Sequence, residues 1–103
     1  MNYGTALSAL ADPTRRALFE RLRRRERAVG DLAKQARISQ PAVSQHLRVL
    51  RRARLVQERR VGTRHYYRAS HEGLADLKRY LESLWDDVLG AYAAQSRRPP
   101  EDS

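Results

Sequence analysis

One segment, SQPAVSQHLRVLRRARLV at residues 39–56, constrains the fold of this 103-residue chain more than any other. Ser39 is a common helix-capping residue and Pro41 suits a first helical turn, so we expect a helix over residues 40–53. Its apolar side chains recur three or four positions apart and form one stripe, which comprises Val43, Leu47 and Leu50. Directly afterwards the apolar period changes to that of a strand, so a strand is expected to follow the helix without a long loop.

Three further helices are expected before this segment. Residues 3–11 have leucines at helical spacing, and Asp12 followed by Pro13 is a typical start for a second helix that extends to about Arg24. A third, short helix over residues 30–37 has its small and apolar side chains on one face, and Ile38 and Ser39 then form a tight turn. Two helices joined by such a turn make up a helix-turn-helix motif.

A β-hairpin is expected next, because runs that contain Val and Tyr flank the turn residues Gly62 and Thr63. With these two residues as the loop, the predicted cross-strand pairs are Val56 with Ala69, Glu58 with Tyr67, and Arg60 with His65. We expect the face that carries Val56 and Tyr67 to be buried.

A long last helix is expected from His71 to about Gln95, where apolar residues recur at three and four positions. The polar tail 97–103 contains two prolines and is expected to be disordered. The predicted fold is mainly α with a β-hairpin, in the order α-α-α-α-β-β-α of a winged helix-turn-helix. Its length allows one domain, which we place at residues 1–96.

Positive charge is concentrated in the middle of the chain. The net charge is +9, but residues 13–68 carry 17 basic and only 4 acidic side chains, whereas residues 69–103 are net acidic. Such a surplus favours a polyanionic partner, and nucleic acid ahead of a membrane surface. No apolar run is long enough to span a membrane and no signal peptide is recognisable, so we expect a soluble, cytoplasmic protein.

The face of helix 40–53 that lies opposite its apolar stripe is polar and cationic. Gln side chains suit adenine edges, Arg side chains suit guanine edges, and a helix start favours phosphate. A charged helix face is usually only solvated, but the capped turn before this helix and the arginine-bearing hairpin after it favour double-stranded DNA as the partner. The outward residues are Pro41, Ser44, Gln45, Arg48 and Arg52.

Three stretches, LADPTRRALFERL, AVGDLAKQARISQPAVSQHLRVLRRARLV and VGTRHYYR, resemble the ArsR/SmtB family of bacterial winged-helix repressors over nearly the whole chain. The resemblance implies a homodimer joined through its terminal helices. By position it places in the DNA groove Gln40, Pro41, Ser44, Gln45 and Arg48, and at the wing tip Arg60, Arg64 and His65. To these we add Ser39 at the helix start and Arg59 as a phosphate contact that reads no sequence.

Two positions depart from the family's usual pattern, in which glycine is common. Arg37 lies in the turn between the two helices of the motif, and Arg54 follows the second helix. Both positions are expected to need a left-handed backbone, which costs a non-glycine residue on the order of 1 kcal/mol. Additional phosphate contacts from these arginines are the expected compensation.

Neither a metal site nor an enzyme is expected. The sequence has no cysteine, and the last helix has no histidine beyond His71 at its start. Glu82, Asp86 and Asp87 form an acidic patch, but carboxylates on a long helix are far more often solvated than bound to a cation. We see no catalytic triad or phosphate-binding loop and expect no cofactor. His46 lies at the edge of the apolar stripe, so a core position and a DNA contact are both open.

The apolar stripe of the last helix is too wide to be left in water, and a partner subunit would cover it. Together with the first helix, it supplies the candidate dimer-interface residues Leu7, Leu10, Leu81, Leu84, Trp85, Val88 and Tyr92. Sequence-specific DNA binding by a homodimer is therefore the main prediction. Two alternatives are a non-specific architectural nucleic-acid-binding protein and a protein-interaction module that uses the last helix.

Overall fold

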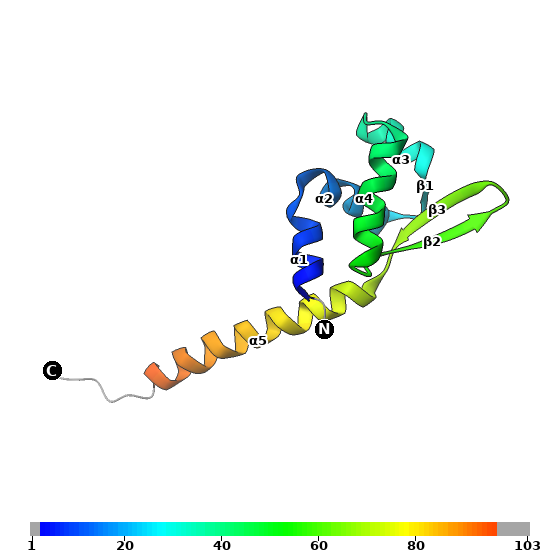
Figure 1. Ribbon diagram of the computed structural model, residues 1–103. Coiled ribbons are helices and arrows are strands. Elements are labelled where there is room, and N and C mark those ends of the chain that lie inside the picture. Colours follow the sequence, from blue (N-terminus) through cyan, green and yellow to red (C-terminus); the bar gives the residue numbers. More distant parts are fainter. Residues whose placement is uncertain (1–2, 97–103) are drawn as a thin grey trace.

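A computed structural model describes residues 3–96, and the tail 97–103 that we expected to be disordered lies outside the described residues. The predicted winged helix-turn-helix fold is confirmed (Figure 1). The elements in chain order are α1 (Tyr3–Ala11), α2 (Pro13–Arg24), β1 (Arg27–Ala28), α3 (Val29–Ala36), α4 (Gln40–Arg52), β2 (Val56–Val61), β3 (Arg64–Ala69) and α5 (His71–Ser96).

Two capping side chains begin the helices where the sequence predicts. Asp12 precedes α2, and its carboxylate accepts a hydrogen bond of 2.9 Å from the backbone N–H of Arg15. Ser39 precedes α4, and its hydroxyl accepts one of 3.2 Å from the N–H of Ala42. Each cap satisfies a backbone donor that the first helical turn leaves without an intrahelical partner.

The sheet has three strands in the order β1-β3-β2, so it contains one strand that sequence analysis missed. The predicted register of the hairpin is confirmed, with Glu58 opposite Tyr67 and a turn at Gly62, whose φ of 61° suits glycine. β1 adds to the free edge of β3 through only two residues, Arg27 and Ala28. So short a strand has no apolar alternation, and its pairing with β3 is set by the tertiary fold.

The core lies between α1, α2, α3, α4 and the base of the hairpin. The predicted stripe of α4 is fully buried, and the predicted buried side of the hairpin is confirmed by Val56 and Tyr67, which are 4% and 9% exposed. α5 packs on α1 at its first turns and then runs away from the body, as Figure 1 shows. Every side chain over residues 81–95 is exposed.

The left-handed backbone expected at two arginines is confirmed, with φ of 58° at Arg37 and 61° at Arg54. Arg37 closes α3, where its N–H bonds to carbonyls of the last helical turn. The guanidinium of Arg54 forms an ion pair of 2.5 Å with Glu72 in the first turn of α5. The side chain of Arg54 therefore contacts α5 in this structure, rather than being free for the phosphate contact that we expected.

The chain passes very closely over itself where α5 begins. The N–H of Gly73 donates a 2.8 Å hydrogen bond to the carbonyl of Arg54, and the N–H of Ser70 donates one of 2.8 Å to the carbonyl of Leu55. A Cβ atom at Gly73 would lie 2.3 Å from the carbonyl oxygen of Ala53, well inside van der Waals contact. This position therefore requires glycine.

Candidate nucleic-acid interface

α4 presents a continuous polar surface to solvent. Its apolar stripe faces inward, and all seven side chains that we predicted to face DNA from this segment are exposed, namely Ser39, Gln40, Pro41, Ser44, Gln45, Arg48 and Arg52. The side chains that carry amides, hydroxyls and guanidinium groups are therefore available to base edges and phosphates. This arrangement is what a helix in a major groove requires.

His46 lies at the margin between this surface and the core. It is half-buried, and it lies near the cap of α2, where it contributes to a lowered pKa of Asp12. The main cause of that lowered pKa is the hydrogen bond from the backbone N–H of Arg15, and the Coulombic effect of His46 is smaller. The histidine therefore lies beside α2 rather than at the centre of the outward face.

The hairpin β2–β3 extends from the body as a wing beside α4 (Figure 1). Arg60 and Arg64 near its tip are exposed, as a role in DNA binding requires, whereas His65 is half-buried. Arg59 is not free for the phosphate contact that we expected, because its guanidinium donates hydrogen bonds of 2.6 and 3.1 Å to Glu26. The same guanidinium lies 5.4 Å from the centre of the Tyr66 ring, a cation–π distance.

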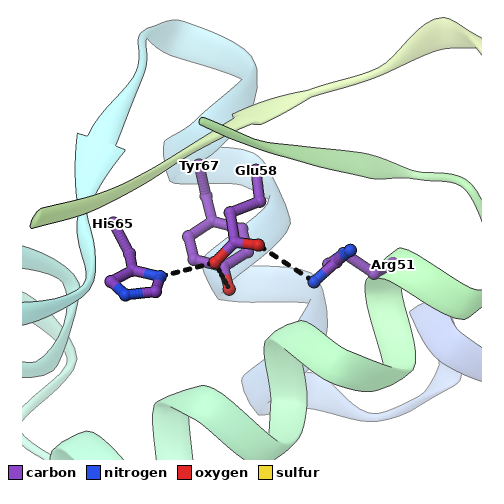
Figure 2. Close-up of polar contacts among 4 residues, drawn as sticks. All are labelled: Arg51, Glu58, His65 and Tyr67. Atoms are coloured by element: carbon purple, nitrogen blue, oxygen red, sulfur yellow. Dashed lines mark hydrogen bonds and ion pairs between the residues drawn. The ribbon is translucent and has the colours of Figure 1, made fainter. Parts of the chain in front are cut away.

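A carboxylate at the base of the wing binds three neighbours, as Figure 2 shows. Glu58 accepts a hydrogen bond of 3.1 Å from Arg51 in the last turn of α4, and one of 3.1 Å from the hydroxyl of Tyr67. The oxygen that accepts from Tyr67, Oε2, also lies 2.6 Å from Nδ1 of His65. The Glu58 side chain is only 13% exposed. Through its contacts, this group of four residues connects α4 to both strands of the wing.

Glu58 was not among the residues that we predicted to have a function. The predicted register already placed it opposite Tyr67, and it is the single acidic residue among the cationic residues of the hairpin, which was an available signal. Its contact with Arg51 depends on the packing of the hairpin on α4. No local pattern predicts that contact.

The environment of Glu58 makes the folded state sensitive to acid. The hydrogen bond with His65 is the main cause of a lowered pKa of Glu58, the hydroxyl of Tyr67 adds to it, and burial opposes both. A carboxylate whose pKa is lower in the folded chain than in the unfolded chain stabilises the fold at pH values above its usual pKa of 4.5. This stabilisation is lost as the pH falls through the lower pKa of the folded chain.

We therefore expect the free energy of unfolding to decrease as the pH falls below about 4.5, and to decrease less steeply in Glu58→Gln. Urea denaturation at a series of pH values measures both slopes. Equal slopes in the two proteins would show that Glu58 does not carry this dependence.

A second surface of the molecule is apolar and lies along α5. Large hydrophobic side chains that are 42–70% exposed include Leu7, Leu81, Leu84, Trp85, Val88, Leu89 and Tyr92. Six of them are predicted interface residues, and Leu89 was not among our candidates. Leu10, which was a candidate, is instead partly buried against the core. An apolar groove of 740 Å³ runs past Leu74, Leu81 and Trp85 on the same face.

Over residues 3–96, no group of three or more His, Asp or Glu side chains is arranged to hold a metal ion. The acidic residues Glu82, Asp86 and Asp87 therefore do not gather into such a site. Among the helices that the structure describes, none is long and apolar enough to cross a membrane.

The sequence of this chain is similar to those of several known proteins. Residues 12–58 match the model of a family described as bacterial regulatory protein, arsR family. The HTH-type transcriptional regulator Rv2034 of Mycobacterium tuberculosis is 51% identical over 88 residues, which cover 85% of this chain and 82% of that protein. A transcriptional repressor SmtB homolog of Synechocystis is 47% identical over 70% of this chain and 54% of its own length.

Two solved structures have the same fold along almost the entire chain. An ArsR-like transcriptional regulator from Rhodococcus sp. RHA1 superposes with a TM-score of 0.77 at 29% identity, and the match covers 95% of each chain. A possible transcriptional regulator for arsenical resistance has a TM-score of 0.72 at 39% identity, over 95% of this chain and 99% of that one.

Proposed function

Because this chain belongs to the ArsR family of bacterial DNA-binding transcriptional regulators, which are not enzymes, we propose that it is a homodimeric repressor of an inverted-repeat operator. The observation that carries the proposal is the outward face of α4, which is polar, cationic and exposed beside an exposed wing. Residues 1–96 would act as one domain for both DNA binding and dimerisation.

In this proposal α4 lies in the major groove and the wing lies along the flanking backbone or minor groove. Gln45 and Arg48 read base edges, while Ser39 and the start of α4 hold phosphate. Arg60 and Arg64 contact the backbone from the wing. Arg59 is paired with Glu26, which offsets most of its charge, so it adds little to the positive field that attracts phosphate.

Dimerisation follows from the apolar face of α5. A projecting helix with seven exposed large hydrophobic side chains nearby is unfavourable in water, and a second copy offers an identical surface to cover it. Two copies related by a twofold axis would place their recognition helices in successive major grooves, about 34–36 Å apart. Repression would then result from occupation of the operator; that the protein is a repressor is supported by two relatives that are named as transcriptional repressors.

We also propose that no metal ion controls the protein. The support is the donor set itself, since the sequence has no cysteine and its three histidines lie on three different elements. The expected partners are therefore double-stranded DNA and a second copy of the chain.

Substitution of the outward face of α4 tests the proposed orientation. We expect Gln45→Ala and Arg48→Ala each to reduce the preference for one base in a half-site by about 1–3 kcal/mol, because each loses a hydrogen-bonded base contact. Binding to a panel of single-base operator variants measures this preference.

Arg60→Ala is the matched control on the wing. Loss of a phosphate contact should weaken binding to all duplexes alike and reduce the salt slope by about 1. If Gln45→Ala and Arg48→Ala behaved like Arg60→Ala, with base preference intact, another face of α4 would be the one that reads DNA.

A further inference from the structure

An acidic side chain near the DNA-binding surface of a protein with a net charge of +9 opposes the attraction to phosphate. Glu58 is the only acidic residue in the segment from α4 to the end of the wing, residues 40–69. It is also nearly buried, with 13% of its side chain exposed, so it is not simply a solvated surface charge. Its contacts indicate what it does there.

The two carboxylate oxygens of Glu58 connect different elements. Oε1 accepts the hydrogen bond from Nη1 of Arg51 on α4, whereas Oε2 contacts both Nδ1 of His65 and the hydroxyl of Tyr67 on β3 (Figure 2). Burial, and then the adjacent Glu58, raises the pKa of Tyr67, so the phenol stays protonated and donates. The strand pairing holds β2 to β3, but Glu58 additionally joins this pair to the last turn of the recognition helix.

Glu58 also lines the groove between the wing and the helix-turn-helix motif. This groove has a volume of 600 Å³, and its other lining residues include Gln40 and Ser44 from α4 and Arg64 and His65 from the wing. Four of our predicted DNA-binding residues therefore surround it. A change in the angle of the wing would change the distance between these two sets of side chains.

We infer that Glu58 is a positioning residue that fixes the wing relative to the recognition helix and restrains Arg51 and His65, and thereby raises the preference for operator over other DNA. The inference rests on the proposed function. With Glu58 in place, Arg51 and His65 each have a partner inside the protein, so they do not bind the phosphates of every DNA sequence alike. The wing meets DNA at one angle, which suits one arrangement of groove and backbone.

The test is Glu58→Gln, measured by titration of a labelled operator duplex and a scrambled duplex of equal length at several salt concentrations. We expect binding to scrambled DNA to strengthen and its salt slope to steepen by about 1 to 2, because Arg51 and His65 become available to phosphate. We expect the ratio of operator to scrambled affinity to fall by about tenfold. A residue that only stabilised the fold would not strengthen binding to scrambled DNA.

Glu26→Gln is the matched control. It removes the same charge and releases an arginine of the same wing, Arg59, but the Glu26 ion pair joins β2 to the residue before β1 and not to α4. We expect it to strengthen binding to both duplexes alike and to leave their ratio unchanged. If Glu58→Gln also left the ratio unchanged, its effect would be one of net charge alone and the positioning role would be refuted.

A second variant keeps the test decisive if Glu58→Gln folds poorly. Arg51→Met cuts the connection to α4 and leaves Glu58 paired with His65 and Tyr67. Here the ratio should fall while binding to scrambled DNA weakens, because a cation is lost; an unchanged ratio would refute the inference. Wild-type protein that did not distinguish the two duplexes would refute the proposed function itself, and that result is separate from any variant.

Discussion

Leu81→Asp is expected to make the protein monomeric and to weaken its binding to a full inverted repeat by about a hundredfold or more. Leu81 lies on the apolar stripe of α5 and is 51% exposed. A carboxylate there would have to be buried without a partner in a dimer interface, which is strongly unfavourable. A monomer binds one half-site and loses the gain of about 10²–10⁴ that linked binding provides.

Sedimentation equilibrium and titration of the operator duplex measure the two effects. Trp85 is the only tryptophan of the chain and lies on the same stripe, so its fluorescence should shift to the blue as wild-type protein dimerises and should not shift in Leu81→Asp. Ser83→Asp is the matched control, because it adds the same charge about 200° around the helix. A dimeric Leu81→Asp protein would mean that α5 does not form the interface.

Gly73→Ala is expected to lower the free energy of unfolding by roughly 3 kcal/mol, at the upper end of the cost of overpacking. The added Cβ would lie 2.3 Å from the carbonyl oxygen of Ala53 and 2.9 Å from that of Arg54. Both atoms belong to the backbone and cannot rotate away. The hydrogen bond from Gly73 to the carbonyl of Arg54, which fixes the start of α5 against the end of α4, would be lost or lengthened.

Urea denaturation at neutral pH measures this loss, with Gly90→Ala as the control. Gly90 also lies within α5, but a Cβ there meets nothing within 4 Å, so alanine should raise stability by up to about 1 kcal/mol through its helix propensity. Opposite signs at these two glycines are the expected result. A Gly73→Ala protein as stable as wild type would show that the junction can open at little cost.

The parts of the fold that depend on local sequence were predictable. Asp12 and Ser39 cap the helices where expected, the apolar stripe of α4 faces inward, and the hairpin has the predicted register. The left-handed backbone at Arg37 and Arg54 was also foreseen, from the resemblance to a family in which glycine is common there. Strand β1 was not, because two residues that pair with a distant strand carry no periodic signal.

The candidate site was predictable in outline, but its charge pairs were not. The exposed face of α4 follows from helical spacing, whereas the partners of arginine side chains depend on the tertiary fold. Arg54 binds Glu72, 18 residues away, and Arg59 binds Glu26, 33 residues away. Long flexible guanidinium side chains reach such partners only once helices and strands have packed, so composition could suggest phosphate contacts without showing which arginines are already paired.

Selection of bound sequences from random duplex DNA, at about 0.15 M salt where non-specific electrostatic binding is weak, tests the central claim most directly. A sequence-specific homodimer should enrich one inverted repeat whose half-sites lie about one helical turn apart. Retention of DNA without any consensus would contradict this function and favour an architectural nucleic-acid-binding protein instead.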